Sequence, residues 1–251
     1  MAVFYNQFFY FICIISYLLN QNGEKMKKIS LSAIVAISIL SACTNASANE
    51  VGVSFQLTGT SNYMLRGLSL SNDKAAVFGD ITIGYGNFFG GIWASNVEFE
   101  GVTDTDAEID FYAGYANSFY DLSVSAVYAR YTYGSELVDD SDDLKFDISY
   151  PFGKVTLGGK YEIATWNEND EAEKNDYVEG YVGYDFGVAT ATVSVGSWEN
   201  TGDNYMLALS KSGKFAEQDV EFKVRYVRFN SEDETVNPDD DTLFADVIFS
   251  F

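Results

Sequence analysis

Period-two alternation of apolar and polar residues recurs along almost the whole chain after residue 48. For example, Val220, Phe222 and Val224 alternate with charged residues. No stretch of helical length in this part of the chain keeps a 3.6-residue stripe instead. The composition agrees, because 18 Tyr and 20 Phe beside only 2 Pro favour strands. The pattern therefore predicts β-strands that each have one apolar and one polar face.

The connections between the expected strands alternate strictly in length. We expect about 12 strands, at residues 51–68, 76–86, 89–98, 108–117, 121–133, 143–150, 155–166, 177–186, 188–199, 204–211, 219–229 and 242–251. Short connections fall at residues 86–88, 117–121, 151–154 and 185–188, with a longer one at 212–218. Longer and mostly acidic connections fall at residues 69–75, 99–107, 134–143, 167–176, 199–204 and 230–241. All long loops then leave one end of an up-and-down antiparallel sheet.

An even number of strands of about ten residues, with short turns at one end and long loops at the other, is typical of outer-membrane β-barrels. The sequence therefore predicts an all-β fold, a transmembrane antiparallel up-and-down β-barrel formed by residues 49–251. Both termini are then periplasmic, and the acidic loops are extracellular. A soluble β-sandwich or propeller would tolerate the alternating residues, but it does not explain the alternating loop lengths.

The last expected strand ends on an aromatic residue. Val247, Phe249 and Phe251 share its apolar face, opposite Asp246. In a closed barrel the last strand pairs with the first, so it needs no polar tail. This aromatic ending resembles the C-terminal signal that the bacterial outer-membrane assembly machinery reads, which makes that machinery an expected partner.

Residues 26–48 have the organisation of a secretory signal peptide, with a basic start, an apolar stretch and an A-x-A cleavage site that ends at Ala48. We expect the apolar residues 1–25 to result from a mis-assigned start codon, with an extra hydrophobic segment as the alternative. Residues 40–43 resemble a lipobox, so lipidation of Cys43 is an alternative to cleavage after Ala48. Either route exports the protein. Cleavage after Ala48 removes both cysteines, so the mature chain needs no disulfide.

The charge and the missing histidines exclude several functions. A formal net charge of -22 leaves no basic surface for nucleic acid. The His count of 0 removes imidazole acid–base chemistry, His metal ligands and every Ser-His or Cys-His nucleophile. No glycine-rich phosphate loop occurs between a strand and a helix. We therefore expect neither an enzyme nor a bound cofactor.

The N-terminal third carries distinctive short motifs. They lie within residues 61–73, 90–101 and 107–115. Tyr63, Arg66 and Gly67 form a Tyr-x-x-Arg-Gly stretch, and residues 93–97 read Trp-Ala-Ser-Asn-Val. These stretches resemble the TorF-type porins, a family of bacterial outer-membrane proteins, closely in the first strands and mainly in architecture beyond them. The resemblance implies an outer-membrane barrel with a porin function.

If the apolar faces of the strands meet lipid, the polar faces line the lumen. The charged residues on those faces are the expected pore-lining positions, because charges cannot face lipid cheaply. They are Arg66, Asp80, Asp110, Lys145, Asp147, Lys160, Glu162, Glu179, Glu221, Lys223, Arg225 and Asp246. One hypothesis is a small pore for small hydrophilic solutes, with a preference for cations. The other is that these groups pair across the interior and close it.

Arg66 and the tryptophans each have two interpretations. Arg66, expected on the polar face of the first strand, lies either at the pore constriction or in a salt bridge to a carboxylate such as Asp80. Aromatic residues at strand ends are expected in the interfacial girdles of the barrel. They are Trp93, Trp166 and Trp198 with Tyr63, Tyr85, Tyr115, Tyr128, Tyr131, Tyr150, Tyr161 and Tyr184. A carbohydrate-binding groove lined by tryptophan is the alternative.

The acidic loops offer oxygen ligands for divalent cations. Residues 139–143 and 237–241 would suit Ca²⁺ or Mg²⁺, but neither has the spacing of an EF-hand. We expect a solvated outer face without a dedicated metal site. Outer-membrane lipid and lipopolysaccharide, bridged loosely by divalent cations, are the expected partners. A non-conducting barrel that displays these loops is the alternative to a channel.

Overall fold

The computed structural model describes residues 50–105, 107–168, 175–233 and 239–251. The expected signal peptide, residues 1–25 before it and Cys43 lie outside the described residues. Within the described ranges the chain forms strands, turns and loops, and no helix there is long and apolar enough to cross a membrane.

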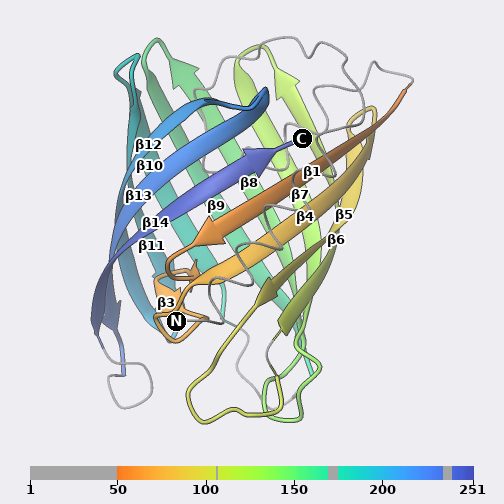
Figure 1. Ribbon diagram of the computed structural model, residues 1–251, viewed down its shortest axis with the longest axis vertical. Helices are drawn as coiled ribbons and strands as arrows, with labels where there is room; N and C mark the ends of the chain where they lie inside the picture. Colours follow the sequence, from red (N-terminus) through yellow and green to blue (C-terminus); the bar gives the residue numbers. More distant parts are fainter. Residues whose placement is uncertain (1–49, 106, 169–174, 234–238) are drawn as a thin grey trace. The chain divides into compact units, whose positions relative to one another are not determined.

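Twelve strands close into one antiparallel barrel in which each strand pairs with its neighbours in sequence (Figure 1). They are β1 (Val51–Thr60), β4 (Ala76–Tyr85), β5 (Phe88–Asn96), β6 (Ala107–Phe119), β7 (Leu122–Thr132), β8 (Ser141–Phe152), β9 (Val155–Asn167), β10 (Tyr177–Asp185), β11 (Thr190–Trp198), β12 (Gly202–Phe215), β13 (Gln218–Ser231) and β14 (Asp240–Ser250). Two further strands, β2 (Met64–Leu65) and β3 (Leu68–Ser69), form a small separate hairpin. The prediction of a twelve-stranded up-and-down barrel is confirmed.

The barrel closes between its first and last strands. Residues 56–60 of β1 pair with residues 246–250 of β14. Just beyond this register, the backbones of Phe55 and Phe251 exchange two hydrogen bonds of 3.2 and 2.9 Å, and their rings lie 5.5 Å apart. The terminal aromatic residue therefore completes the seam of the barrel.

Side chains alternate between the two faces of each strand, as the pleat requires. On β10, Tyr177 and Glu179 are buried, whereas Val178 and Val182 are 52% and 49% exposed. On β14, Asp246 is buried on the inner face, opposite to the face that carries Val247. The exterior is therefore an apolar surface far larger than a soluble monomer exposes, and it suits contact with lipid.

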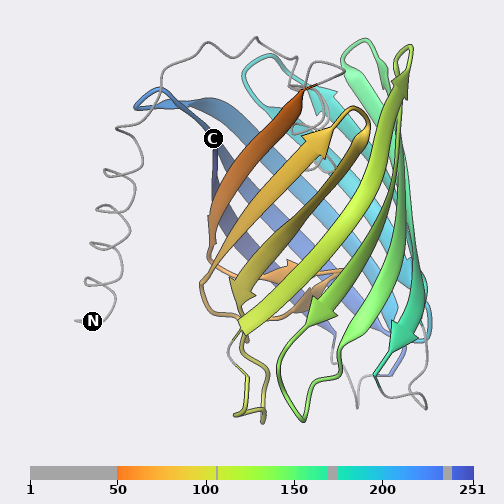
Figure 2. The same ribbon diagram turned by 90° about the vertical axis from the view of Figure 1, so that its right-hand side faces the viewer.

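The connections alternate in length as the sequence predicts, with one exception. The longer connection expected at residues 199–204 is reduced to residues 199–201, because β11 ends at Trp198 and β12 begins at Gly202. Short turns join the strands at one end of the barrel, and the longer connections leave from the other end (Figure 2). The turn between β12 and β13 is shorter than expected, because these strands stay paired as far as Phe215 and Gln218. Only Ala216 and Glu217, with φ angles of 48° and 73°, make this turn, as in a two-residue hairpin.

The expected first strand, residues 51–68, is wrong in its second half. β1 ends at Thr60, and residues 61–75, here called the inserted segment, leave the barrel wall. Asn62 organises this segment, because its side-chain oxygen accepts hydrogen bonds from the hydroxyls of Ser69 at 2.7 Å and Ser71 at 3.2 Å. Its amide nitrogen also donates to Asp73 at 2.7 Å. These local bonds compete with the sheet ladder and end the strand.

Candidate functional site

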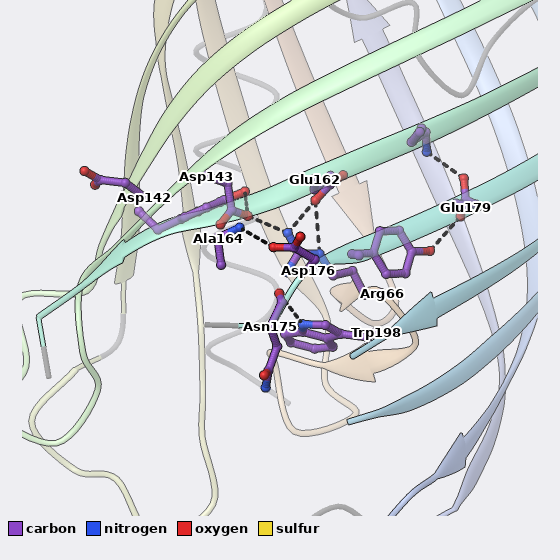
Figure 3. A network of polar contacts seen from close by, with 12 residues as sticks. Arg66, Asp142, Asp143, Glu162, Ala164, Asn175, Asp176, Glu179 and Trp198 are labelled. Carbon is purple, nitrogen blue, oxygen red and sulfur yellow. Dashed lines mark hydrogen bonds and ion pairs between the residues drawn. The ribbon is translucent and has the colours of Figure 1, made fainter. Parts of the chain in front are cut away.

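The inserted segment folds into the barrel lumen and carries Arg66 at its tip, between β2 and β3. The guanidinium donates to a carboxylate oxygen of Asp143 at 2.5 Å and, through Nε and a terminal nitrogen, to Glu162. Figure 3 shows Arg66 beside Asp143 and Glu162, which lie on β8 and β9. In the order of the barrel strands, β8 and β9 are on the opposite side from β1 and β4, which flank the inserted segment in the sequence. Arg66 therefore ties the segment to the opposite wall.

Two aromatic rings flank the same guanidinium. The carbon at its centre lies 4.9 Å from the ring centroid of Trp198 and 5.3 Å from that of Tyr177. The Arg66 side chain is only 8% exposed, a condition under which cation–π attraction is strongest. Burial by itself lowers the pKa of Arg66, but Glu162 and Asp143 outweigh it and raise that pKa above its ordinary value. Arg66 is therefore a permanent cation in the lumen.

Gly67 allows the tip to approach the wall closely. Its φ angle of 98° lies in the left-handed region that favours glycine. A Cβ atom added there would lie 2.7 Å from the ring of Phe229 and 2.8 Å from the Cβ atom of Asn204. Phe229 belongs to β13 and Asn204 to β12, so the Arg-Gly tip contacts strands around much of the far wall.

The eleven other expected pore-lining residues lie on the inner faces of their strands, and most of them have polar or charged partners. Lys160 pairs with Glu179 at 2.8 Å, and Arg225 pairs with Asp246 at 2.8 Å. Other contacts join Lys223 to Glu221 at 3.7 Å and Lys145 to the ring of Tyr131 at 4.9 Å. Asp80 accepts hydrogen bonds of 2.5 Å from Tyr112 and 2.7 Å from Thr82. The inner wall is thus lined largely by side chains that contact one another in pairs.

Two expectations about Arg66 need correction. It lies on the inserted segment and not on the first strand, because that strand ends six residues earlier. Its carboxylate partners are Asp143 and Glu162, whereas Asp80 bonds to Tyr112 and Thr82. A partner more than seventy residues away in sequence has no signature in the local pattern.

Sequence reasoning missed two interior carboxylates, Glu108 and Asp143. Both are at least 96% buried. Glu108 lies two residues before Asp110, and Asp143 two residues before Lys145. Each therefore faces the same side of its strand as a residue that is expected in the interior. The period-two pattern therefore already indicated an interior position for both residues. The prediction omitted them because each stands at the start of an expected strand, next to an acidic loop of similar composition.

The prediction that the tryptophans lie in the interfacial girdles is wrong for Trp93 and Trp198. Trp198 lies in the lumen against Arg66, and Trp93 packs against Tyr63 of the inserted segment at a centroid distance of 5.5 Å. Trp166 stacks on Arg130 at 4.6 Å. Of the tyrosines expected in the girdles, five have exposed rings on the outer face, namely Tyr85, Tyr128, Tyr150, Tyr161 and Tyr184. Burial of tryptophan inside the barrel gives the lumen an aromatic lining next to its charges.

Two of the long loops, at residues 97–105 and 133–140, are linked to each other by hydrogen bonds. Asp104 accepts hydrogen bonds from the Ser135 hydroxyl at 2.8 Å and the Glu136 amide at 2.7 Å. Within the described ranges, no three acidic, His or Cys side chains converge in a way that could hold a metal ion. Part of the acidic run at residues 237–241 lies outside the described residues.

A closed barrel with an apolar exterior, a charged interior and one segment clamped across the lumen defines a β-barrel of the outer-membrane type. The chain belongs to the bacterial protein family Gcw_chp, described as of unknown function, whose pattern matches residues 43–246. This family carries no functional description, so the resemblance to TorF-type porins stays a prediction.

Comparison with curated proteins found no match. Among solved structures, the COG4313 outer membrane channel from Pseudomonas putida F1 is similar with a TM-score of 0.48 and 11% identity, over 80% of this chain and 93% of that one. The outer membrane phospholipase A from Escherichia coli is similar with a TM-score of 0.48 and 13% identity, over 86% and 98%. OccK5 (OpdH) from Pseudomonas aeruginosa has a TM-score of 0.41 and 13% identity, over 80% and 66%. At these values the likeness does not bear on function.

Proposed function

We propose that this protein is a channel of the bacterial outer membrane that admits small hydrophilic solutes past a constriction made by the inserted segment. The observation that carries the proposal is the position of Arg66, a buried cation that holds one segment across the lumen of a barrel with an apolar exterior. Fixed charges at the narrowest part of a pore are a common basis of ion selectivity. The termini of the barrel are then periplasmic, and outer-membrane lipid and lipopolysaccharide surround its outer face.

The test is single-channel conductance of the refolded mature chain in a planar bilayer under a KCl gradient. Arg66→Ala removes the link to Asp143 and Glu162, so the tip of the segment is released and the conductance should increase several-fold. Arg228→Ala, which removes an exposed arginine that bonds only to Asn230 among the described residues, is the matched control and should conduct like the unmodified protein. An unchanged trace for Arg66→Ala would remove Arg66 from the constriction.

A non-conducting barrel that displays its acidic loops is the second candidate, and the dense pairing of interior charges favours it. It predicts a folded, heat-modifiable barrel that stays silent in the bilayer, with or without Arg66. Shortening residues 135–139 should then reduce binding of divalent cations or lipopolysaccharide while the barrel remains folded. If the shortened protein still bound divalent cations or lipopolysaccharide equally well, this loop would not be the binding surface.

Hydrolysis of lipid or peptide is the least supported activity. The chain contains 0 His, so a nucleophile activated by imidazole cannot form. Three carboxylates of the lumen, those of Asp80, Glu179 and Asp246, bond to tyrosine or arginine side chains, which suits a structural role.

A further inference from the structure

Charge is distributed unevenly over the inner wall of the barrel. On β13 and β14, the carboxylates of Asp246 and Glu221 have basic partners, Arg225 at 2.8 Å and Lys223 at 3.7 Å. On β4 and β6, Asp80, Glu108 and Asp110 have none, since the ion pairs of the described residues all lie elsewhere. One wall is therefore close to neutral and the other carries excess negative charge.

The three carboxylates on the negative wall are close neighbours in the sheet. Asp80 lies directly opposite Trp93 on β5, and Trp93 lies directly opposite Asp110 on β6. Glu108 is the preceding inner-face residue on the same strand as Asp110. Side chains directly opposite each other in adjacent strands are about 5 Å apart at their Cβ atoms. The carboxylates and one indole ring thus form a continuous patch.

Two carboxylate oxygens in this patch have no partner among the described residues. Glu108 is 0% exposed; Tyr133 donates to one of its oxygens at 3.2 Å, and the other accepts no hydrogen bond. One oxygen of Asp110 is likewise buried and unpaired. Asp80, by contrast, is satisfied by Tyr112 and Thr82. A buried carboxylate without a partner is costly, so Glu108 and Asp110 require either a proton or a cation.

Several features of the surroundings favour a monovalent cation. Trp93 is the direct cross-strand neighbour of Asp80 and Asp110, so aromatic surface adjoins the acidic groups. Its ring packs at tilted angles against those of Phe78 and Tyr63, at centroid distances of 5.3 and 5.5 Å. Aromatic faces attract monovalent and ammonium cations. The nearby cation Lys145 lies over the ring of Tyr131 and forms no ion pair with either carboxylate. No three acidic side chains of the described chain converge as a divalent ion requires.

We propose that Glu108 and Asp110, with Trp93 beside them, bind a monovalent cation such as potassium or ammonium and thereby make the channel select cations. The position lies against the inserted segment, because Tyr63 of that segment packs on Trp93. The selectivity part of this proposal rests on the proposed channel function; the binding part does not.

Binding can be measured without any conductance. The apparent unfolding temperature of the refolded barrel in detergent should rise by roughly 3 °C or more when potassium or ammonium chloride replaces N-methyl-D-glucamine chloride at constant ionic strength. In the double variant Glu108→Gln/Asp110→Asn this rise should disappear. The control Glu221→Gln should keep it, because the unbonded oxygen of Glu221 already has the ammonium group of Lys223 at 3.7 Å. The double variant should be at least as stable as the unmodified protein without potassium, because two unpaired charges are gone.

Selectivity is measured by the reversal potential in a planar bilayer under a KCl gradient. The cation preference should fall several-fold in Glu108→Gln/Asp110→Asn and stay unchanged in Glu221→Gln. The proposed binding site would be contradicted if potassium did not stabilise the unmodified protein, or if it still stabilised the double variant. Stabilisation by potassium in a barrel that never conducts would instead confirm the site and contradict the channel function.

Discussion

At the scale of single residues, Arg66 shows how a buried charge fixes the position of the inserted segment. Taking a guanidinium out of water costs several kcal/mol. Asp143, Glu162 and the rings of Trp198 and Tyr177 offset that cost only at one place in the lumen. Loss of one partner of a buried ion pair typically costs about 3–5 kcal/mol. The tip therefore has one preferred position against the far wall.

Gly67 provides a test of that close packing. Gly67→Ala should withdraw the tip from the wall, because its Cβ atom would lie 2.7 Å from the ring of Phe229 at a φ angle of 98°. We expect a conductance close to that of Arg66→Ala in an otherwise folded barrel. The matched control is Gly101→Ala, which has a positive φ angle of 78° but open space around its Cβ position. Equal conductance in both glycine variants and the unmodified protein would contradict the packing argument.

Asp104 gives a pH-dependent contact in the loops. Hydrogen bonds from the Ser135 hydroxyl and the Glu136 amide hold the pKa of Asp104 below its ordinary value of 3.8. Because the folded-state pKa is lowered, the contact is complete above pH 3.8 and weakens as the pH falls below that value. Hydrogen exchange of the Glu136 amide should therefore be slow at pH 7 and lose its protection as the pH falls through the lowered pKa of Asp104, below 3.8. In Asp104→Asn the remaining protection should not change with pH over this range; the same pH-independent protection in the unmodified protein would contradict this role.

At the scale of elements, the strands differ in how far they are paired. β1 pairs with β4 along residues 51–60, but with β14 only along residues 56–60. Stability is not uniform across a structure, and regions with fewer hydrogen bonds open first. The seam is therefore the place where the barrel is expected to open.

A disulfide across the seam tests this expectation. Gly59 lies directly opposite Val247, and a Cβ atom at Gly59 has no neighbour within 4 Å. The variant Gly59→Cys/Val247→Cys should form a crosslink that raises the unfolding temperature, since it closes a long loop worth up to about 4 kcal/mol. Val53→Cys/Ile83→Cys, which joins β1 to β4 instead, should raise it less. A larger effect at the control position would show that the seam is not the weak point.

Strand positions illustrate what the residue pattern can and cannot predict. Alternation located each of the twelve barrel strands and the inner face of the expected interior residues other than Arg66, because the pleat imposes a period of two on every strand. It failed between Thr60 and Leu68, where the pattern continues but Asn62 bonds locally to Ser69 and Ser71. The prediction also omitted Glu108 and Asp143 from the interior residues, because the ends of these strands have the same acidic composition as the adjoining loops.

At the scale of the whole molecule, the barrel and the inserted segment are separable. β1 and β4 are paired as far as Thr60 and Ala76, on either side of the segment, so the wall is complete without it. The lumen, by contrast, depends on the segment, because its tip contacts β8 and β9 through Arg66.

Replacing residues 62–74 by a short Gly-Ser turn should therefore leave a folded, heat-modifiable barrel with a larger conductance than Arg66→Ala. The physical reason is that the whole segment leaves the lumen, not only its anchor. Replacing residues 98–105, another long loop, should change the conductance much less. A barrel that no longer refolds without the segment would show that wall and segment form one cooperative unit.

The sequence by itself determined the strands, their inner and outer faces, the short and long ends of the barrel and the charged character of its interior. These follow from local periods and loop lengths, which depend on residues close together in the chain. The tertiary structure alone decided that residues 61–75 enter the lumen and that Arg66 pairs with Asp143 and Glu162. It also left one buried oxygen of Glu108 and one of Asp110 without a hydrogen-bond partner. Asp143 and Glu162 lie 77 and 96 residues from Arg66, and only closure of the barrel brings them within hydrogen-bonding distance.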